Sequence, residues 1–394
     1  MKNNNRTSLS QLLKTHQSEI TRYLFPGKMK WENLLETIRR QEISKSPNFK
    51  DEQIWTFLIA CGYALSGEAG LHELTKILTG SDLPLPPKPK VWLEALPLPP
   101  RQKEGNTNVD LALGTISIRR RTKSGIELEK DKVTWVCFCE MKFNSDIARK
   151  ITHDNNRNQL LRVIENALCF QNLGKYAEKI YVSLVTPEIF RSKKGLQQYR
   201  EQFEKYRNNA GSIEEELDYS CLQKREQSKW HYPEDISERI NKLHLNWVSY
   251  EELFSHLPVP SESGLNRLYQ EIKHFWEFFG LSPEDWYQGL LNAEESAGGV
   301  LSYTPLMKLL ESPQDNKRVA LQYLPLALSC ALQNDYCLQD IKNASKTYPD
   351  LIPDIVTCAI NLRKDKLFSD WTKYESNKYK DFIVRLEDRL SKKR

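Results

Sequence analysis

The sequence lacks the features that define several large classes of protein. No apolar run is long enough to span a bilayer and the start carries no signal peptide, so we expect no membrane association. The eight cysteines include no Cys-x-x-Cys pair and follow no disulfide pattern, which argues against a structural zinc and favours the cytoplasm. The chain also lacks the Gly-x-x-x-x-Gly-Lys-Ser/Thr motif of P-loop motor ATPases.

Histidine spacing and net charge do not define a site either. The seven histidines are scattered without metal-ligand spacing, and a net charge of +5 is too small to establish nucleic-acid binding by itself. Positive charge is concentrated at Arg119, Arg120, Arg121 and Lys123. These side chains would suit the phosphates of a nucleic acid, although a solvated hairpin tip explains them equally well.

Charged residues interrupt two otherwise apolar stretches. Asp110 lies within residues 106–114, and Glu140 and Lys142 end the apolar run that begins at residue 133. Because strand side chains alternate between faces, Glu140 and Lys142 should project from the same face of one strand.

A polar segment with a glycine, residues 122–125, separates the expected strands 111–121 and 126–143 and suits a hairpin or a short loop. Asp110 and Glu140 lie at about equal distances from its centre, so antiparallel pairing across the turn would bring them together. A bulge or a slip of one residue would change the faces on which they lie.

Two carboxylates and a lysine at neighbouring strand ends suit metal-dependent hydrolysis of a phosphodiester. Mg²⁺ is usually held by one or two carboxylates, which Asp110 and Glu140 would supply, and Mn²⁺ would substitute for it. Lys142 would orient the attacking water or stabilise charge on the phosphate. The alternative is an ion pair without a function, but buried charges of that kind are costly unless they are paired.

This arrangement resembles the motif of the PD-(D/E)xK nuclease superfamily, which has a restriction-endonuclease-like fold. In that family an Asp opens the second strand of the core and Glu-x-Lys closes the third, positions that Asp110, Glu140 and Lys142 match. Val109 stands where the family motif has proline. The resemblance covers roughly residues 50–187 and implies an Mg²⁺-dependent endonuclease acting on DNA, in prokaryotic defence or DNA processing.

The expected order of elements agrees with that core. The pattern predicts a helix over 51–78 that Gly67 and Gly70 split or kink, a strand over 91–96, the two interrupted strands, a helix over 159–170 and a strand over 179–186. Many family members carry a further acid on the first helix, for which the candidates are Glu68 and Glu73, although each also fits a solvent-facing position. On the second helix, Gln159 and Arg162 are candidates for contacts with the metal site or with a phosphate.

The sequence therefore predicts an α/β fold in three parts. Residues 1–50 would form an N-terminal helical extension, residues 51–257 a nuclease-like core with a mixed sheet flanked by helices, and residues 264–394 a helical domain. The last part would read DNA, bind a protein partner or form a homodimer. The alternatives are an inert binding or scaffold protein with a nuclease fold, and a nuclease that acts on RNA.

Overall fold

The computed structural model describes residues 8–44, 52–105, 107–131, 133–143, 154, 157–191, 198–227, 229–280, 324, 328, 331, 335–364 and 376–392. The chain divides into two compact units, residues 1–38 with 49–273 and residues 39–48 with 274–394. The boundary after the core therefore lies later than the expected 257–264. The physical reason is that the first turns of α12 (Asn266–Phe279) pack on the core, where Tyr269 donates a hydrogen bond to the Leu257 carbonyl at 3.0 Å.

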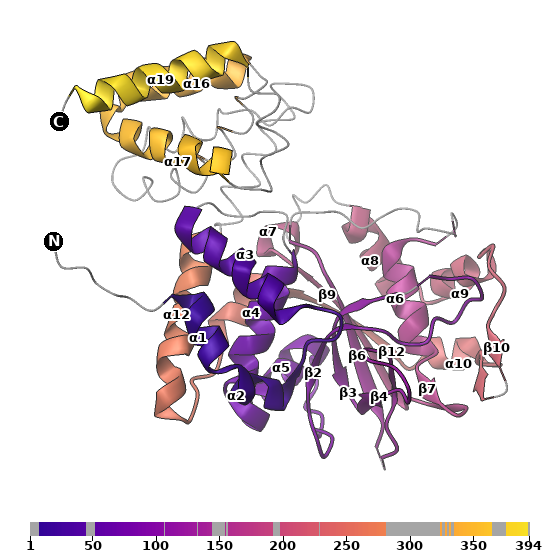
Figure 1. Ribbon diagram of the computed structural model, residues 1–394. Coiled ribbons are helices and arrows are strands. Elements are labelled where there is room, and N and C mark those ends of the chain that lie inside the picture. The colour runs from indigo at the N-terminus through magenta and orange to yellow at the C-terminus, as the bar shows by residue number, and fades with distance from the viewer. Residues whose placement is uncertain are drawn as a thin grey trace. The chain divides into compact units, whose positions relative to one another are not determined.

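A mixed six-stranded sheet forms the centre of the first unit, in the order β1-β2-β3-β6-β9-β12 (Figure 1). Neighbours β2, β3 and β6 are antiparallel, whereas β6, β9 and β12 are parallel to one another and β1 is parallel to β2. The strands are β1 (Leu24–Phe25), β2 (Val91–Ala95), β3 (Val109–Gly114), β6 (Trp135–Met141), β9 (Lys179–Thr186) and β12 (Leu243–Ser249).

Helices cover both faces of this sheet. Phe138 of β6 contacts Phe170, which follows α6 (Gln159–Leu168), whereas Ser183 of β9 donates a hydrogen bond to the Leu78 carbonyl of α5 (Gly67–Thr79). Phe138 pairs with Val182, the neighbour of Ser183, so α6 and α5 lie on opposite faces. This double cover explains why β6 is apolar and buried at every position up to its acidic end.

Two expected elements are broken by glycines. The helix predicted over 51–78 is divided, as its glycines predicted, into α4 (Glu52–Ala64) and α5, whose first residue, Gly67, has a φ of +62°. The strand predicted to continue to residue 121 ends at Gly114, whose φ is +130° and where a Cβ would lie 2.3 Å from the Trp135 carbonyl oxygen. The chain then forms a separate hairpin of β4 (Ile116–Ile118) and β5 (Ile126–Leu128).

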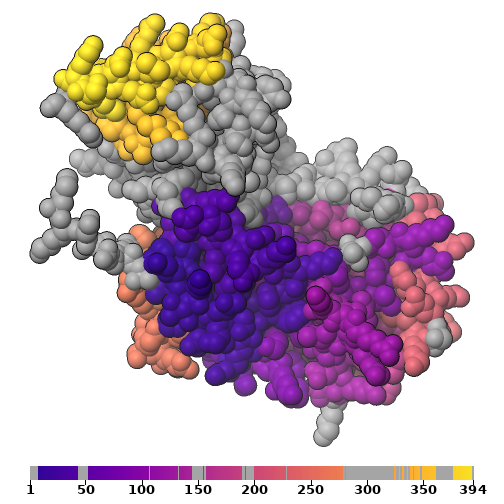
Figure 2. Space-filling view, in the orientation of Figure 1, coloured from indigo at the N-terminus to yellow at the C-terminus, as the bar shows by residue number. Residues whose placement is uncertain are grey.

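The N-terminal helices belong to the first unit and do not form a separate extension, and Figure 2 shows them packed directly on its surface. The other helices of this unit are α1 (Leu9–Thr15), α2 (Gln17–Tyr23), α3 (Trp31–Ser44, of which residues 39–44 group with the second unit), α7 (Glu188–Arg191), α8 (Gln198–Asn208), α9 (Gly211–Asp218), α10 (Ile236–Ile240) and α11 (Tyr250–Ser255). Two small hairpins complete it, β7 (Gln171–Asn172) with β8 (Lys175–Tyr176) and β10 (Glu226–Gln227) with β11 (Trp230–His231).

The second unit is helical throughout its described ranges. It contains α16 (Asp335–Thr347), α17 (Ile352–Lys364) and α19 (Asn377–Ser391), with apolar positions such as Ile341 and Ile383 fully buried. Across both units, no helix within the described residues is long and apolar enough to cross a membrane.

A buried network of charges fastens α6 to the segments around it. Glu165 of α6 is fully buried, accepts a hydrogen bond from Arg101 Nε at 2.6 Å and another from the Tyr232 hydroxyl at 2.9 Å, and pairs with Arg157. Arg101 also donates to the Leu217 carbonyl at 2.8 Å. The chain that leads into β3 is thereby fixed to α6 and to the end of α9.

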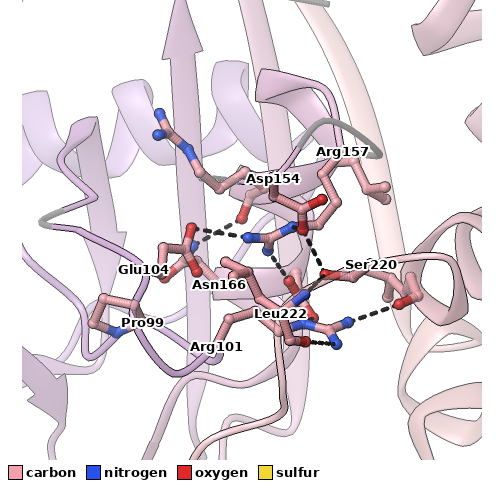
Figure 3. A network of polar contacts seen from close by, with 12 residues as sticks. Pro99, Arg101, Glu104, Asp154, Arg157, Asn166, Ser220 and Leu222 are labelled. Atoms are coloured by element: carbon pink, nitrogen blue, oxygen red, sulfur yellow. Dashed lines mark hydrogen bonds and ion pairs between the residues drawn. The ribbon is translucent and has the colours of Figure 1, made fainter. Parts of the chain in front are cut away.

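Arg157 forms the second centre of this network and lies between two further acids (Figure 3). Its Nε donates to Asp154 at 2.8 Å and its Nη2 lies 3.3 Å from Glu104. Ser220 donates to the same Asp154 carboxylate. Because Arg157 is 0% exposed, its charge is stabilised by these acids and not by water.

We expect Arg157→Met to lower the free energy of unfolding by about 3–5 kcal/mol, because it leaves Glu165 and Asp154 buried with less compensating charge. Urea denaturation followed by circular dichroism measures the change. The matched control is Arg207→Met, which removes an exposed pair with Glu204 and should change stability by less than about 0.5 kcal/mol. Equal effects of the two substitutions would contradict a stabilising role for the network.

Candidate active site

Three acidic residues lie at the same level of three neighbouring strands. Leu111 pairs with Cys139 in the antiparallel strands β3 and β6. The same register extended by one residue places Asp110 opposite Glu140, as the position of the turn predicted. Pairs on either side, including Leu93 with Leu111, place Glu94 of β2 opposite Asp110. Residues directly opposite one another in antiparallel strands lie within about 5.5 Å at Cα, so this acidic row is compact.

Lys142 follows β6 directly and lies against the acidic row. Its Nζ is 2.7 Å from Glu140 Oε1 and 3.4 Å from Glu52 Oε2. The ion pair with Glu140 confirms the expectation that residues 140 and 142 share a face. Both side chains are buried, with exposures of 2% for Glu140 and 5% for Lys142. Asp110 is half-buried, and its Oδ2 accepts a hydrogen bond from the Met141 amide at 2.8 Å.

The acid that the first helix brings to Lys142 is Glu52, at the start of α4. The expected candidates, Glu68 and Glu73, lie on α5, beyond the break in the predicted helix, and Glu68 is exposed. Acids are common in the first turn of a helix because they favour its positive end, so Glu52 has the sequence signal of an ordinary helix start. Its closeness to Lys142 depends on how α4 packs.

Glu94 is the second site residue that the sequence pattern does not single out. It is the last residue but one of β2, is 8% exposed and has a φ of +44°, which is rare for a residue other than glycine. Its carboxylate accepts hydrogen bonds from Gln53 Nε2 at 3.2 Å and from Asn108 Nδ2. The available signal was a charge inside an apolar strand, the same signal that marked Asp110.

Gly27 presses on the backbone at Glu94. A Cβ at residue 27 would lie 1.8 Å from the Leu93 carbonyl oxygen and 2.8 Å from that of Glu94, so the close approach requires glycine. The φ of Gly27 is also positive, at +58°. This contact holds the loop after β1 against the strained position in β2.

The electrostatics of the site favour a bound cation. Burial raises the pKa of Asp110, and the neighbouring charge of Glu140 raises it further. Burial lowers the pKa of Lys142, but Glu140, Glu52 and Asp110 outweigh that effect and hold it above its ordinary value. Burial also raises the pKa of Glu94. A single lysine among four acids leaves the group with net negative charge when all are ionised.

The donor set fits a hard divalent cation such as Mg²⁺ or Mn²⁺. Asp110 and Glu140 offer carboxylate oxygens, and Glu140 Oε1 is buried without a hydrogen bond in the described part of the chain, although Lys142 lies beside it. No group of three His, Cys, Asp or Glu side chains within the described ranges is gathered to hold a metal ion. The protein would therefore supply two ligands, and water and substrate the remainder.

The other predicted site residues lie on α6 and on the β4–β5 hairpin. Gln159 begins α6 and is half-buried. Burial raises the pKa of Glu104, and Arg162 lies close enough to the buried network for its charge to offset part of that rise. The predicted phosphate contacts, residues 119–123, belong to the hairpin that follows the opposite end of β3 from Asp110 (Figure 1). Within that hairpin Arg119 is half-buried, whereas Arg120, Arg121 and Lys123 are exposed. The roles of these residues stay predictions.

Comparison with known proteins gives no relative for this chain. No family model, curated protein or solved structure matches it. The architecture that the structure establishes is an α/β fold with a mixed six-stranded sheet flanked by helices. The chemistry of the acidic row is inferred from its geometry.

We expect Asp110→Asn to raise the unfolding midpoint of the metal-free protein at pH 7 by about 2–4 °C, a shift that corresponds to about 1 kcal/mol. The pKa of Asp110 is raised in the folded state, so ionisation of this residue opposes folding at every pH above its ordinary value of 3.8. The advantage of the variant should therefore grow as the pH rises from 4 upward. Thermal unfolding in EDTA across this range measures it.

The same variant should lose any stabilisation by Mg²⁺ or Mn²⁺ that the wild type shows. Glu68→Gln, on the exposed face of α5, is the control and should behave as the wild type in both conditions. A lower midpoint of Asp110→Asn at every pH would mean that the hydrogen bond from Met141 outweighs the repulsion between the acids.

Proposed function

We propose that this protein is a metal-dependent endonuclease of the PD-(D/E)xK type that hydrolyses phosphodiester bonds in DNA. The observation that carries the proposal is Asp110 opposite Glu140, with Lys142 Nζ 2.7 Å from Glu140. The order α4-β2-β3-β6-α6-β9 supports it, because helix, three antiparallel strands, helix and parallel strand is the order of the restriction-endonuclease-like core. Prokaryotic defence or DNA processing is the setting that this likeness favours.

The roles of the three residues follow from their contacts. Asp110 and Glu140 would hold Mg²⁺ or Mn²⁺, which when bound supplies positive charge to the phosphate and acidity to the attacking water. The Lys142 ammonium lies 2.7 Å from Glu140 Oε1, but its contacts with Glu52 and the Met141 carbonyl are both 3.4 Å. Long contacts of this kind are weak, so an ammonium N–H can be redirected to a substrate oxygen at little cost.

Glu52 acts through Lys142 in this scheme. Its carboxylate and that of Glu140 contact the ammonium group together and favour its charged form. The lysine is therefore a donor and an electrostatic stabiliser, and not a general base. Glu52 is a positioning residue, because it reaches the reacting atoms through another side chain.

Cleavage assays with and without Mg²⁺ or Mn²⁺ test the proposal, on plasmid, linear duplex, single-stranded DNA and RNA. The wild type should cut DNA only with the metal, and Asp110→Ala and Lys142→Ala should each reduce the rate by at least about 100-fold, since each removes a group that acts on the reacting atoms. Glu68→Gln is the matched control and should retain the wild-type rate, because its side chain is exposed on α5.

Each other outcome selects a different conclusion. Equal cutting by the wild type and both variants would place the activity elsewhere and overturn the assignment. Cutting of RNA alone would keep the chemistry and change the substrate. Absence of both cutting and metal binding would identify an inert binding or scaffold protein.

We expect Glu52→Gln to reduce the rate by about 10- to 100-fold, less than Lys142→Ala, because it loosens Lys142 without removing it. Rates measured between pH 6 and 10 should fall by a similar factor throughout, because Glu140 and Asp110 still hold the pKa of Lys142 above its ordinary value. A rate equal to that of the wild type would show that Glu52 supports only the packing of α4.

A further inference from the structure

A cavity of about 340 Å³ opens beside the acidic row. Glu94 is the carboxylate of the row that lines it, together with Gln53 and Asn108; Lys28, Lys30 and Asn33 also line it. The volume falls within the range of small-ligand pockets, about 300–1,000 Å³. Because Glu94 lies on β2, the strand next to β3, the cavity adjoins the strand that carries Asp110.

The inner wall of the cavity offers hydrogen-bond acceptors. Asn108 donates its Nδ2 to Glu94, which fixes the orientation of its amide and leaves Oδ1 buried without a partner in the described part of the chain. Glu94 accepts two hydrogen bonds, from Gln53 and Asn108, whereas an ionised carboxylate has about four acceptor sites. Buried acceptors are normally satisfied, so this wall suits a ligand with neighbouring N–H donors.

Positive charge lines the same cavity nearer to solvent. Lys28 and Lys30 are both exposed, in the short segment between β1 and α3. Lysines suit the phosphates of a nucleic-acid backbone. A ligand with an N–H edge at one end and a phosphate at the other would satisfy both parts of the cavity, and a nucleotide has this form.

We infer that the cavity receives an unpaired guanine of the substrate strand, next to the bond that is cleaved. The position of this guanine beside a cleaved bond rests on the proposed nuclease function. Guanine presents two adjacent N–H donors, N1–H and the 2-amino group, which match the two oxygens of Glu94. In a duplex this edge is occupied by cytosine, so the base has to be unpaired to enter. The substrate is therefore a single strand, or a duplex opened at a guanine.

Nucleotide binding to the full chain in EDTA tests this inference without any cleavage. Isothermal titration with guanosine, adenosine and cytidine monophosphates and with inorganic phosphate should show guanosine monophosphate binding at least about 10-fold more tightly than the other three ligands. Glu94→Gln should lose this preference, because an amide cannot accept both N–H groups. Asp110→Asn should keep it, since Asp110 does not contact the base in this scheme.

Two further variants complete the test. Glu68→Gln is the same chemical change at an exposed position and should bind as the wild type. Lys28→Ala with Lys30→Ala should weaken the binding of all three nucleotides by a similar factor while keeping the order of affinities, and both lysines are exposed. This pair keeps the inference testable if Glu94→Gln does not fold.

The outcomes separate this inference from the proposed function. Equal affinities for the three nucleotides, or affinities equal to that for phosphate, would overturn the guanine site whatever the cleavage assays show. Retention of the preference by Glu94→Gln would overturn it as well. A guanine preference that depends on Glu94, in a protein that cuts no nucleic acid with Mg²⁺ or Mn²⁺, would support the guanine site and overturn the proposed nuclease function.

Discussion

The ammonium group of Lys142 lies among carboxylates that would otherwise repel one another at the buried end of β3 and β6. Glu140 and Glu52 contact it directly, and Asp110 is close enough to raise its pKa. Two of the four side chains, Glu140 and Lys142, are almost completely buried. Isolated charges in such a place would cost several kcal/mol each, so the sheet can hold acids here because a cation is held with them.

The remaining features of the site follow from this pairing. One cation neutralises one acid of the group, so negative charge remains for a divalent ion to offset. The surrounding fold supplies the rigidity that such an arrangement needs. Arg101 and Arg157 fasten the approach to β3 against α6 through Glu165, and the parallel pairing of β6 with β9 continues to Lys142, whose amide donates to the Val185 carbonyl at 2.8 Å.

The sequence was most informative where the determining contacts are local. Alternation along one strand and the position of a turn are enough to place Asp110, Glu140 and Lys142 together, and the sheet has that pairing. The prediction of one continuous hairpin was wrong in detail. The pairs β3 with β6 and β4 with β5 have different registers, and Gly114 ends the first pairing. A positive φ at glycine has no signature in an alternation pattern.

Glu52 and Glu94 were not predicted because their positions depend on packing between distant segments. Glu52 reaches Lys142 across 90 residues of sequence, and its place is set by α4 against β2 and β3. Glu94 faces its cavity through a backbone conformation that alternation does not describe. The division of the chain after residue 273, and the inclusion of the N-terminal helices in the first unit, also depend on packing, since apolar helix faces match any surface of similar shape.

The contact between Gly27 and β2 also limits how this protein can vary. A side chain at residue 27 would meet the Leu93 carbonyl, so it could be accommodated only if the strand moved away at that point. That movement would release the unusual conformation of Glu94 and the hydrogen bonds that Gln53 and Asn108 make to it. A substitution at a loop glycine, remote from the catalytic lysine in sequence, would thus alter one end of the acidic row. Related chains that change residue 27 should have changed residue 94 as well.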